Sequence, residues 1–522
     1  MGHLIEEIIP AVAEEPLTII GQTVSATAAG TTTTHPDLIV PTTANDAAPP
    51  LNKAGQWAII GLIVLANFFQ FTCMFTTVAG GYEFSKRLGV EPGPGKANWM
   101  AAAYGLTQSA MVLISGRLGA VYGHNNSMFV GAASIALFSL TTAVCRTYDS
   151  FVAMRAMSGI GGGLLMPNAV ATLMIMIPPG LTRNATLAVF AASPPVGALI
   201  GALLAGVFLD QGDWKWLFIV ISLLMVATIV PLFCLLPKEE PVDKQGKIDF
   251  IGIVLGLSGL ILFSFAWNQA PASGWDTPYI IATTVLSLVL LGAFFVWESR
   301  FATEPIIPLK VFAAPTFTAL IIVVLVTYMS VGIFLWYMVA WQQLIRGWTV
   351  LETAVGWVPF AVGASCAVAL AAVLVPRLEA QWILCIGVLT SLASLILLAT
   401  MPAQQLYWKQ TFPAIFLASM CPDLVYVAAQ IIASNSVGKR EQGVAGSLIG
   451  TLNLYGNSLG LGIAGTVEVE VVRRGASELW GFRSALYFGA GLTVIALVIN
   501  LLFVRVPKDE HSEWKAEADS PA

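Results

Sequence analysis

The chain has 522 residues, of which 57% are hydrophobic and only 11% are charged, and its formal net charge is −5. Soluble domains carry about a quarter charged residues, so this composition excludes a soluble enzyme. The acidic balance leaves no basic surface, which argues against nucleic-acid binding.

The first 55 residues differ from the rest of the chain. They contain the run TTTTHPDLIVPTTANDAAPP, which has little apolar surface to bury. They also lack a basic stretch followed by an apolar one, so we expect no cleavable signal peptide. The sequence therefore predicts a disordered cytoplasmic tail over 1–55, and the first apolar run must itself direct membrane insertion.

Long apolar runs follow one another from Trp57 almost to Val506. A run of roughly eighteen residues or more is long enough, as a helix, to cross the hydrocarbon core of a bilayer. Lipid offers no partner for backbone groups, and these runs lack the alternation of barrel strands, so helices are expected. The fold class is thus an all-α membrane protein with fourteen transmembrane helices, near 57–79, 97–115, 127–145, 150–176, 185–208, 216–236, 250–269, 278–297, 316–341, 354–375, 382–401, 410–436, 444–471 and 484–505.

A polar segment, LPKEEPVDKQGKID at 236–249, follows the sixth helix and marks a boundary. Six helices precede it, and a pair and then six more follow, which is typical of transporters built from repeats. We predict two six-helix bundles with a central helix pair: an N-terminal bundle over 56–236, a linker and two-helix insert over 237–299, a C-terminal bundle over 300–506 and a cytoplasmic tail over 507–522.

An even number of helices places both termini on one side of the membrane. The loops on that side hold more Lys and Arg than the others, and the positive-inside rule makes that side cytoplasmic. The sequons at Asn125 and Asn184 then lie in inner loops, so we expect neither to be glycosylated.

Five segments carry a resemblance to a known family. Residues 115–125, SGRLGAVYGHN, resemble the loop signature of the major facilitator superfamily, and RAMSGIGGGLLMPNA from Arg155 resembles its second motif. DWKWLF at 213–218 is similar to a motif of the fourteen-helix drug:proton antiporter branch, and 298–312 and 421–435 resemble fungal efflux-pump-like members of that branch. The resemblance covers about residues 57–505.

The loop signature implies a conformational switch between the second and third helices. Small residues there let helix ends approach closely, although such spacing also serves simple packing. The acid of the family's signature falls at Ala120, so we predict that a charge lock built on it is missing. The implied switch residues are Gly116, Arg117, Gly119 and Gly123.

Arg155 is the one basic residue inside a predicted span. A charge in the membrane is costly unless it is paired or wetted, which makes such a residue a candidate for function. Its guanidinium can face a substrate or water chain, or it can make a fixed bond between helices. Both interpretations stay open.

Other polar groups in the spans complete the candidate translocation site. Asp423 is a candidate protonatable acid at the start of the twelfth helix, or alternatively a helix N-cap after Pro422. No acid stands around Cys73, where the antiporter branch often carries one. Amides form further polar faces, either for a substrate or for bonds between helices: Asn67, Gln70, Gln108, Gln342, Gln343 and Asn453.

The resemblance implies a secondary active transporter, monomeric and in the plasma membrane, that exports a small organic compound by alternating access with a proton gradient. Uptake or facilitation of a small polar solute such as ammonium is the alternative, and a non-transporting membrane sensor is another. The four histidines lie in tails or a loop, and no group shows metal or nucleophile spacing, so we expect no catalytic residue, no metal and no cofactor.

Overall fold

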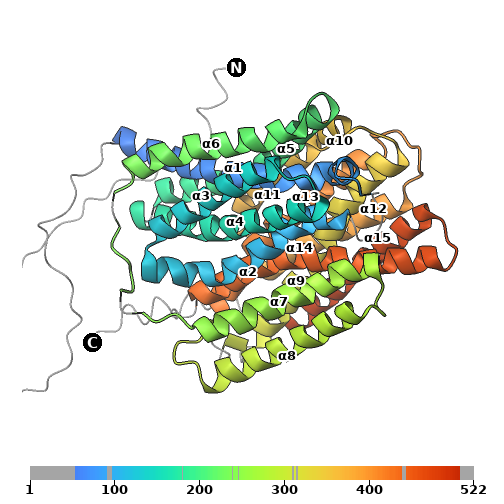
Figure 1. The fold of residues 1–522 in the computed structure, drawn as a ribbon. Helices are drawn as coiled ribbons and strands as arrows, with labels where there is room; N and C mark the ends of the chain where they lie inside the picture. Colours follow the sequence, from blue (N-terminus) through green and yellow to red (C-terminus); the bar gives the residue numbers. More distant parts are fainter. Residues whose placement is uncertain are drawn as a thin grey trace, which may run out of the picture. The chain divides into compact units, whose positions relative to one another are not determined.

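The computed structural model describes residues 53–90, 97–178, 180–237, 239–244, 246–307, 311–312, 315–437 and 442–505. The predicted C-terminal tail lies outside these residues, as does all of the predicted N-terminal tail except 53–55. Within the described part of the chain all long regular elements are helices, packed side by side (Figure 1). The all-α prediction is confirmed.

The N-terminal bundle contains six helices. In it α1 packs against α5 and α6, α2 packs against α4, and α3 packs against α4 and α6. The bounds are α1 Lys53–Arg87, α2 Asn98–Tyr122, α3 His124–Ala143, α4 Tyr148–Met176, α5 Leu181–Asp210 and α6 Trp214–Leu235.

The C-terminal bundle is built around α9, which packs against α14 and α15, while α12 packs against α13 and α15. A π-helical turn, η2, extends the end of α9. The bounds are α9 Pro315–Ala340, η2 Trp341–Ile345, α10 Val350–Gly356, α11 Val358–Leu374, α12 Ala380–Thr400, α13 Thr411–Ser436, α14 Gln442–Arg473 and α15 Glu478–Phe503.

The tenth predicted helix, 354–375, is broken in the structure at Trp357, where α10 ends and α11 begins. Pro359 at the start of α11 has no amide hydrogen to continue the helical ladder. The two pieces together still form one candidate span, from Val350 to Leu374. The described chain therefore crosses the membrane fourteen times, as predicted.

Two of these crossings are less apolar than the others. Twelve segments of the described chain are long and apolar enough to span a bilayer, and α2 and α14 are not among them. Both are long enough, with 25 and 32 residues, but they are rich in glycine and polar side chains. They pack against each other where the two bundles meet, so their polar residues are shielded from lipid.

Glycine permits the closest helix contacts in both bundles. A Cβ atom added to Gly163 of α4 would lie 2.6 Å from the carbonyl oxygen of Gln108 on α2. One added to Gly460 of α14 would lie 2.5 Å from the Cα of Met329 on α9. Neither distance leaves room for a side chain, so these glycines set the spacing of their helix pairs.

The central pair consists of α7, Phe250–Ser273, and α8, Pro278–Arg300. Of the two, α7 touches both bundles, because Trp99 of α2 donates to Gln269 at 2.7 Å and Asn268 donates to the Ser458 carbonyl of α14 at 3.1 Å. Helix α8 packs mainly on α7. Much of α8 therefore faces outward, and only 17% of its most apolar stretch is buried.

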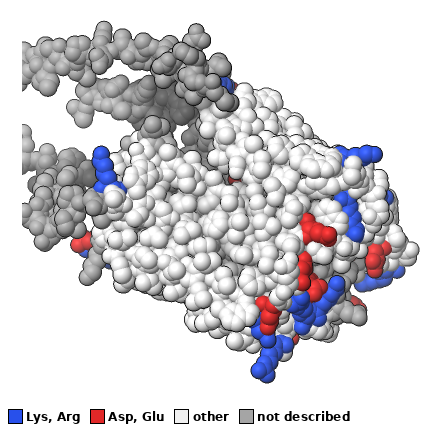
Figure 2. All heavy atoms as spheres, turned by 90° about the horizontal axis from the view of Figure 1, so that it is seen from above, with Lys and Arg blue, Asp and Glu red and all other residues white. Residues whose placement is uncertain are grey.

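Charged side chains are unevenly distributed over the surface. On the face shown in Figure 2, most blue and red side chains gather at one end, a few lie at the opposite end, and a broad region without charge separates them. Exposed large apolar side chains such as Val130, Leu223 and Val289 cover the helices instead. This is the surface expected of a protein whose middle lies in hydrocarbon.

Candidate functional site

Arg155 is fully buried in the N-terminal bundle, and it bonds to one turn of α1. Its guanidinium donates to the carbonyl oxygen of Cys73 at 2.7 Å, the Cys73 Sγ at 3.0 Å and the Thr77 hydroxyl at 3.2 Å. It also lies over the rings of Tyr104 and Phe218, at 4.9 and 5.7 Å. No described carboxylate pairs with it. Backbone carbonyls and aromatic faces therefore hold the cation.

Several polar groups around this bundle's interior have no partner among the described residues. Both amide atoms of Gln70 on α1 and of Gln108 on α2 are buried and unbonded, and so are the Tyr104 hydroxyl and the Arg155 Nε. Asn67 donates to Ser193 of α5 at 2.8 Å, while its oxygen is free. Buried polar atoms are normally satisfied. These groups therefore need hydrogen-bond partners that the described residues do not supply.

Asp423 lies in the C-terminal bundle, near the middle of α13. The prediction that it starts a helix, and with it the N-cap interpretation, is wrong: α13 begins at Thr411 and continues through Pro422. A proline inside a helix is tolerated in a membrane bundle. The Tyr328 hydroxyl donates to the Pro422 carbonyl at 2.8 Å. Asp423 itself is half-buried, with no hydrogen bond among the described residues.

The other predicted amides make hydrogen bonds within the C-terminal bundle or between the bundles. Asn453 accepts from Asn457 one turn on, at 2.9 Å. Gln342 accepts from the Trp357 indole at 2.9 Å, and Gln343 donates to the Ala79 carbonyl of α1 at 2.7 Å. No described contact joins Arg155 to Asp423. The predicted residues thus form separate clusters on the two bundles rather than one compact site.

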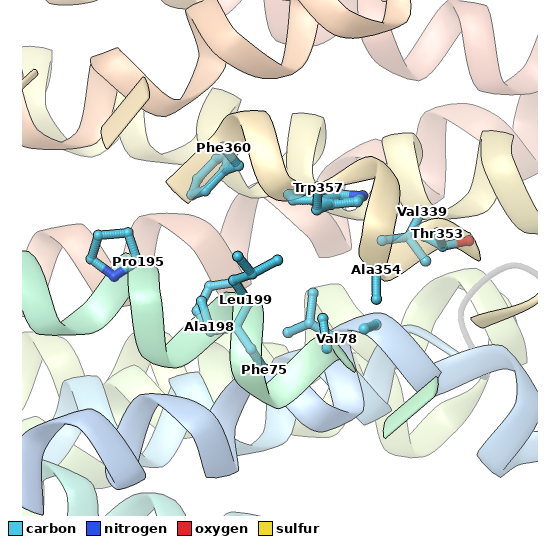
Figure 3. A pocket seen from close by; sticks show the side chains of 12 residues that line it. Phe75, Val78, Pro195, Ala198, Leu199, Val339, Thr353, Ala354, Trp357 and Phe360 are labelled. Atoms are coloured by element: carbon cyan, nitrogen blue, oxygen red, sulfur yellow. The ribbon is translucent and has the colours of Figure 1, made fainter. Parts of the chain in front are cut away.

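The two bundles meet closely at one end, which we name the outer end after the predicted orientation and which contains the C-terminal end of α1. Here Tyr82 of α1 stacks on Trp336 of α9 with ring centroids 4.8 Å apart. The Leu351 amide of α10 donates to Asp210 of α5 at 2.9 Å. The cavity left between α1, α5, α9, α10 and α11 is only about 20 Å³ (Figure 3). The outer end is therefore closed.

The opposite end, which contains the turn between α2 and α3, is named the inner end. Neither α4 nor α13 packs extensively against the opposite bundle. The contact between bundles relies on α2 with α14 and on α5 with α10 and α11. Contacts between the bundles are therefore carried by these helices rather than by α4 and α13.

Comparison with known proteins decides the family. Residues 58–461 and 360–521 match the Major Facilitator Superfamily. This chain belongs to the major facilitator superfamily. It is 33% identical over 414 residues to the low affinity ammonium transporter of Saccharomyces cerevisiae, covering 78% of this chain and 80% of the relative. It is 32% identical over 438 residues to the efflux pump terG of Aspergillus terreus, covering 81% and 82%.

Solved structures agree on the fold. A POT family transporter superposes with a TM-score of 0.62 at 15% identity, over 85% of this chain and 94% of the other. At that identity the likeness concerns architecture alone. As a superfamily member with these spans, the chain is an integral membrane transporter for a small-molecule substrate, and the fungal fourteen-helix resemblance is confirmed.

The superfamily's loop signature is mostly helical in this chain. We predicted a loop over 115–125, but α2 continues to Tyr122 because nothing breaks the helix before Gly123. Gly123 has a φ of +98°, which favours glycine. An added Cβ at Gly119 would collide with Asn168 of α4, whereas at Gly116 it would meet open space.

Arg117 supplies the charge contact at this inner end. It forms ion pairs with Asp243, at 2.8 Å, and with Glu304. These acids lie before α7 and after α8, so they tie the end of α2 to the segments flanking the central pair. The acid of the family's signature is absent at Ala120, as predicted. Arg117 pairs instead with two acids that are distant in sequence. The Ala120 carbonyl accepts from the Asp243 amide at 3.0 Å.

The same end holds a neutral network. The His124 Nδ1 lies 2.8 Å from the Asn168 side-chain oxygen, and the Asn168 amide donates to the Ser115 hydroxyl at 2.8 Å. Three helices, α2, α3 and α4, are linked in this way. His124 is the histidine that was predicted to lie in a loop, and only the folded structure reveals its partner.

A wide apolar groove of about 960 Å³ opens at the outer end of the C-terminal bundle, between α10, α11 and α13. Aromatic side chains line much of it, including Trp348, Tyr407, Trp408 and Phe412. The Tyr407 hydroxyl donates to the Gly356 carbonyl at 2.7 Å, and burial raises the pKa of Tyr407 to about 12. Arg346 lies two residues before Trp348 in the chain, and burial lowers the pKa of its guanidinium.

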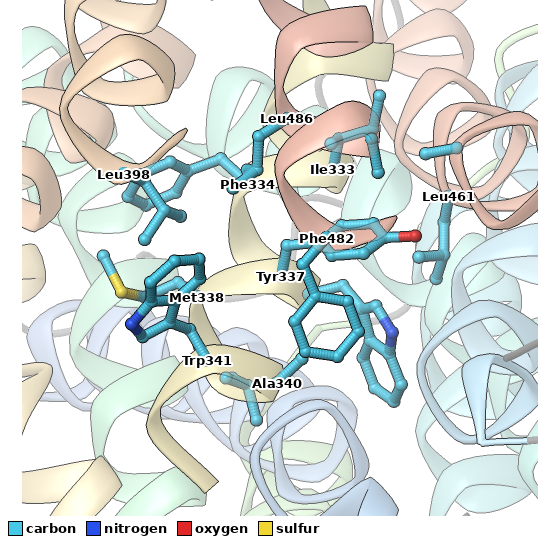
Figure 4. Close-up of a cluster of buried hydrophobic side chains, with 14 of the residues drawn as sticks. Ile333, Phe334, Tyr337, Met338, Ala340, Trp341, Leu398, Leu461, Phe482 and Leu486 are labelled. Carbon is cyan, nitrogen blue, oxygen red and sulfur yellow. The ribbon is translucent and has the colours of Figure 1, made fainter. Parts of the chain in front are cut away.

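Sequence reasoning missed Glu468, one of two buried acids in the described chain. Glu468 of α14 is only 6% exposed, and its carboxylate accepts a hydrogen bond from the Tyr337 hydroxyl at 2.6 Å. Tyr337 belongs to α9, where it lies in a cluster of buried aromatic and aliphatic side chains (Figure 4). An acid inside the predicted span 444–471 was the available signal. Nothing in the sequence singled out Tyr104, whose ring faces Arg155.

Proposed function

We propose that this transporter exports a small organic compound across the plasma membrane by alternating access, driven by the proton gradient, as a monomer with both termini cytoplasmic. Similarity to the efflux pump terG supports export. The excess of Lys and Arg in the loops on the terminal side supports the orientation.

The observation that carries this proposal is the set of unpartnered polar atoms inside the N-terminal bundle. Gln70 and Gln108 come from different helices, are fully buried and have no partner in the described chain. Leaving such groups unbonded costs about 1–3 kcal/mol each. A substrate or water path beside them removes that cost, whereas a purely structural core gains nothing from them.

Purified protein in liposomes tests the proposal. With an imposed pH gradient, we expect flux of the aromatic dye rhodamine 6G that stops when a protonophore collapses the gradient. The changes Gln70→Ala and Gln108→Ala are each expected to lower the flux about fivefold, as loss of ~1 kcal/mol of binding implies. Gln404→Ala, at an exposed glutamine near the outer end, is the matched control.

A second function is supported by one comparison. The relative in Saccharomyces cerevisiae named a low affinity ammonium transporter is at least as similar as the efflux pump. Methylammonium is therefore the second probe in the same liposomes. Flux of methylammonium without flux of rhodamine 6G would replace export by movement of a small polar solute. Flux of neither probe would overturn both functions.

A further inference from the structure

Glu468 lies where α14 meets four other helices near the outer end. A Cβ added to Gly465, one turn earlier, would lie 3.0 Å from the side-chain nitrogen of Asn98 on α2 and 3.2 Å from Pro271 on α7. One added to Gly481 of α15 would lie 3.2 Å from the Glu468 Cγ. Tyr337 approaches from α9. The carboxyl group thus lies among α9, α14 and α15, and Tyr82 of the opposite bundle faces it.

No described cation neutralises this acid. The nearest basic residues on its own helix, Arg473 and Arg474, both pair with Glu470. The titratable groups that face Glu468 are Tyr337 on α9, Tyr82 on α1 and Glu478 on α15. None of them is basic, and the α2 and α7 groups beside the neighbouring Gly465 are a neutral amide and a proline. A charged carboxylate is therefore disfavoured while these helices stay packed.

The acid is coupled to the contact that closes the outer end. Tyr337 follows Trp336 on α9, and Trp336 is the residue that stacks on Tyr82 of the opposite bundle. At the same level, a Cβ on Gly81 would touch the Trp336 ring at 3.1 Å. Separating α1 from α9 would hydrate the region around Glu468. Closure favours the neutral acid and opening favours the carboxylate.

We propose that Glu468 binds the proton that closes the outer end: a proton from outer water adds to the carboxylate, and the neutral acid then packs behind the Tyr82–Trp336 stack. This proposal rests on the proposed proton-coupled function and names the group that carries its proton. Acidic outer pH shifts the protein toward the closed state, and alkaline pH shifts it toward the open one, because protonation and closure are linked.

Hydrogen–deuterium exchange of the full-length protein in lipid nanodiscs tests this without a transport substrate. After correction for intrinsic exchange, peptides covering Tyr82 and Trp336 should be more protected at pH 5.5 than at pH 8. If proton affinity differs tenfold between the two states, the open fraction changes up to about tenfold. Glu468→Gln, which keeps the shape and removes titration, should stay protected at both pH values.

Glu470→Gln is the matched control, because Glu470 lies two residues away and is ion-paired at the surface. It should retain the wild-type pH response. A second variant, Tyr337→Phe, should keep the response but move its midpoint, because the carboxylate loses its donor. A wild-type protein with no pH response, or an unchanged response in Glu468→Gln, would overturn the assignment.

The two proposals fail separately. If rhodamine 6G flux ignores the pH gradient while the exchange of the outer peptides follows Glu468, proton-driven export is wrong and the proton site stands. If flux is proton-driven and Glu468→Gln leaves both flux and exchange unchanged, the proton binds elsewhere.

Discussion

The two bundles bury charge of opposite sign and treat it differently. In the N-terminal bundle, Arg155 is held by backbone and side-chain acceptors on α1 and by two aromatic faces. In the C-terminal bundle, Glu468 has one tyrosine partner, and Asp423 has no hydrogen bond among the described residues. Arginine does not deprotonate in proteins, whereas a carboxylate can take up a proton. The first bundle therefore holds a fixed charge and the second a variable one.

Removing the fixed charge gives the largest expected effect. Arg155→Ala removes the bonds from α4 to Cys73 and Thr77 and should lower transport at least tenfold, since loss of charged hydrogen bonds costs about 1.5–3 kcal/mol. Flux per molecule, with membrane abundance measured in parallel, checks it. Arg377→Ala, at an exposed arginine that follows α11 and donates to the Val373 carbonyl, is the control. Full transport in Arg155→Ala would remove its assigned role.

Changing the variable charge at Asp423 is expected to have an intermediate effect. Asp423→Asn keeps the shape and removes a second titrating group, so it should lower the maximum flux severalfold, while the pH dependence of flux persists because Glu468 remains. Because Asp423 and Arg155 share no partner, the effects of Asp423→Asn and Arg155→Lys should multiply in the double variant. A double variant no worse than Arg155→Lys alone would show that the two groups act as one unit.

The smallest effect is expected at the inner end, where charge lies on the surface. Arg117→Gln removes ion pairs to Asp243 and Glu304, all of them about one-third to one-half exposed. Such pairs contribute roughly 0–1 kcal/mol, so flux should change by less than about fivefold. High salt should weaken the wild-type contact and leave the variant unaffected. A tenfold loss of flux would instead show that the contact controls the conformational change.

The sequence predicted the helices well and the polar contacts poorly. All fourteen crossings were found, because a run of apolar residues must be a helix in lipid whatever its neighbours are. The end of α2 and the interior position of Asp423 were misjudged, since glycines and Pro422 resemble breaks when the packing that supports them is unknown. Arg155 was found because it is the one basic residue inside a predicted span, whereas the acid Glu468 inside another span was overlooked. Its bonding to Cys73 was not predictable from spacing.

Sequence alone determined the class of protein, the number of crossings and the superfamily signature, because composition and local periodicity fix how the chain meets water and lipid. Only the tertiary structure decided which polar groups meet. Arg117 finds its acids in segments flanking the central pair, and Glu468 finds Tyr337 on another helix. Such pairings depend on how helices far apart in the chain rotate and pack, and no short-range pattern records that.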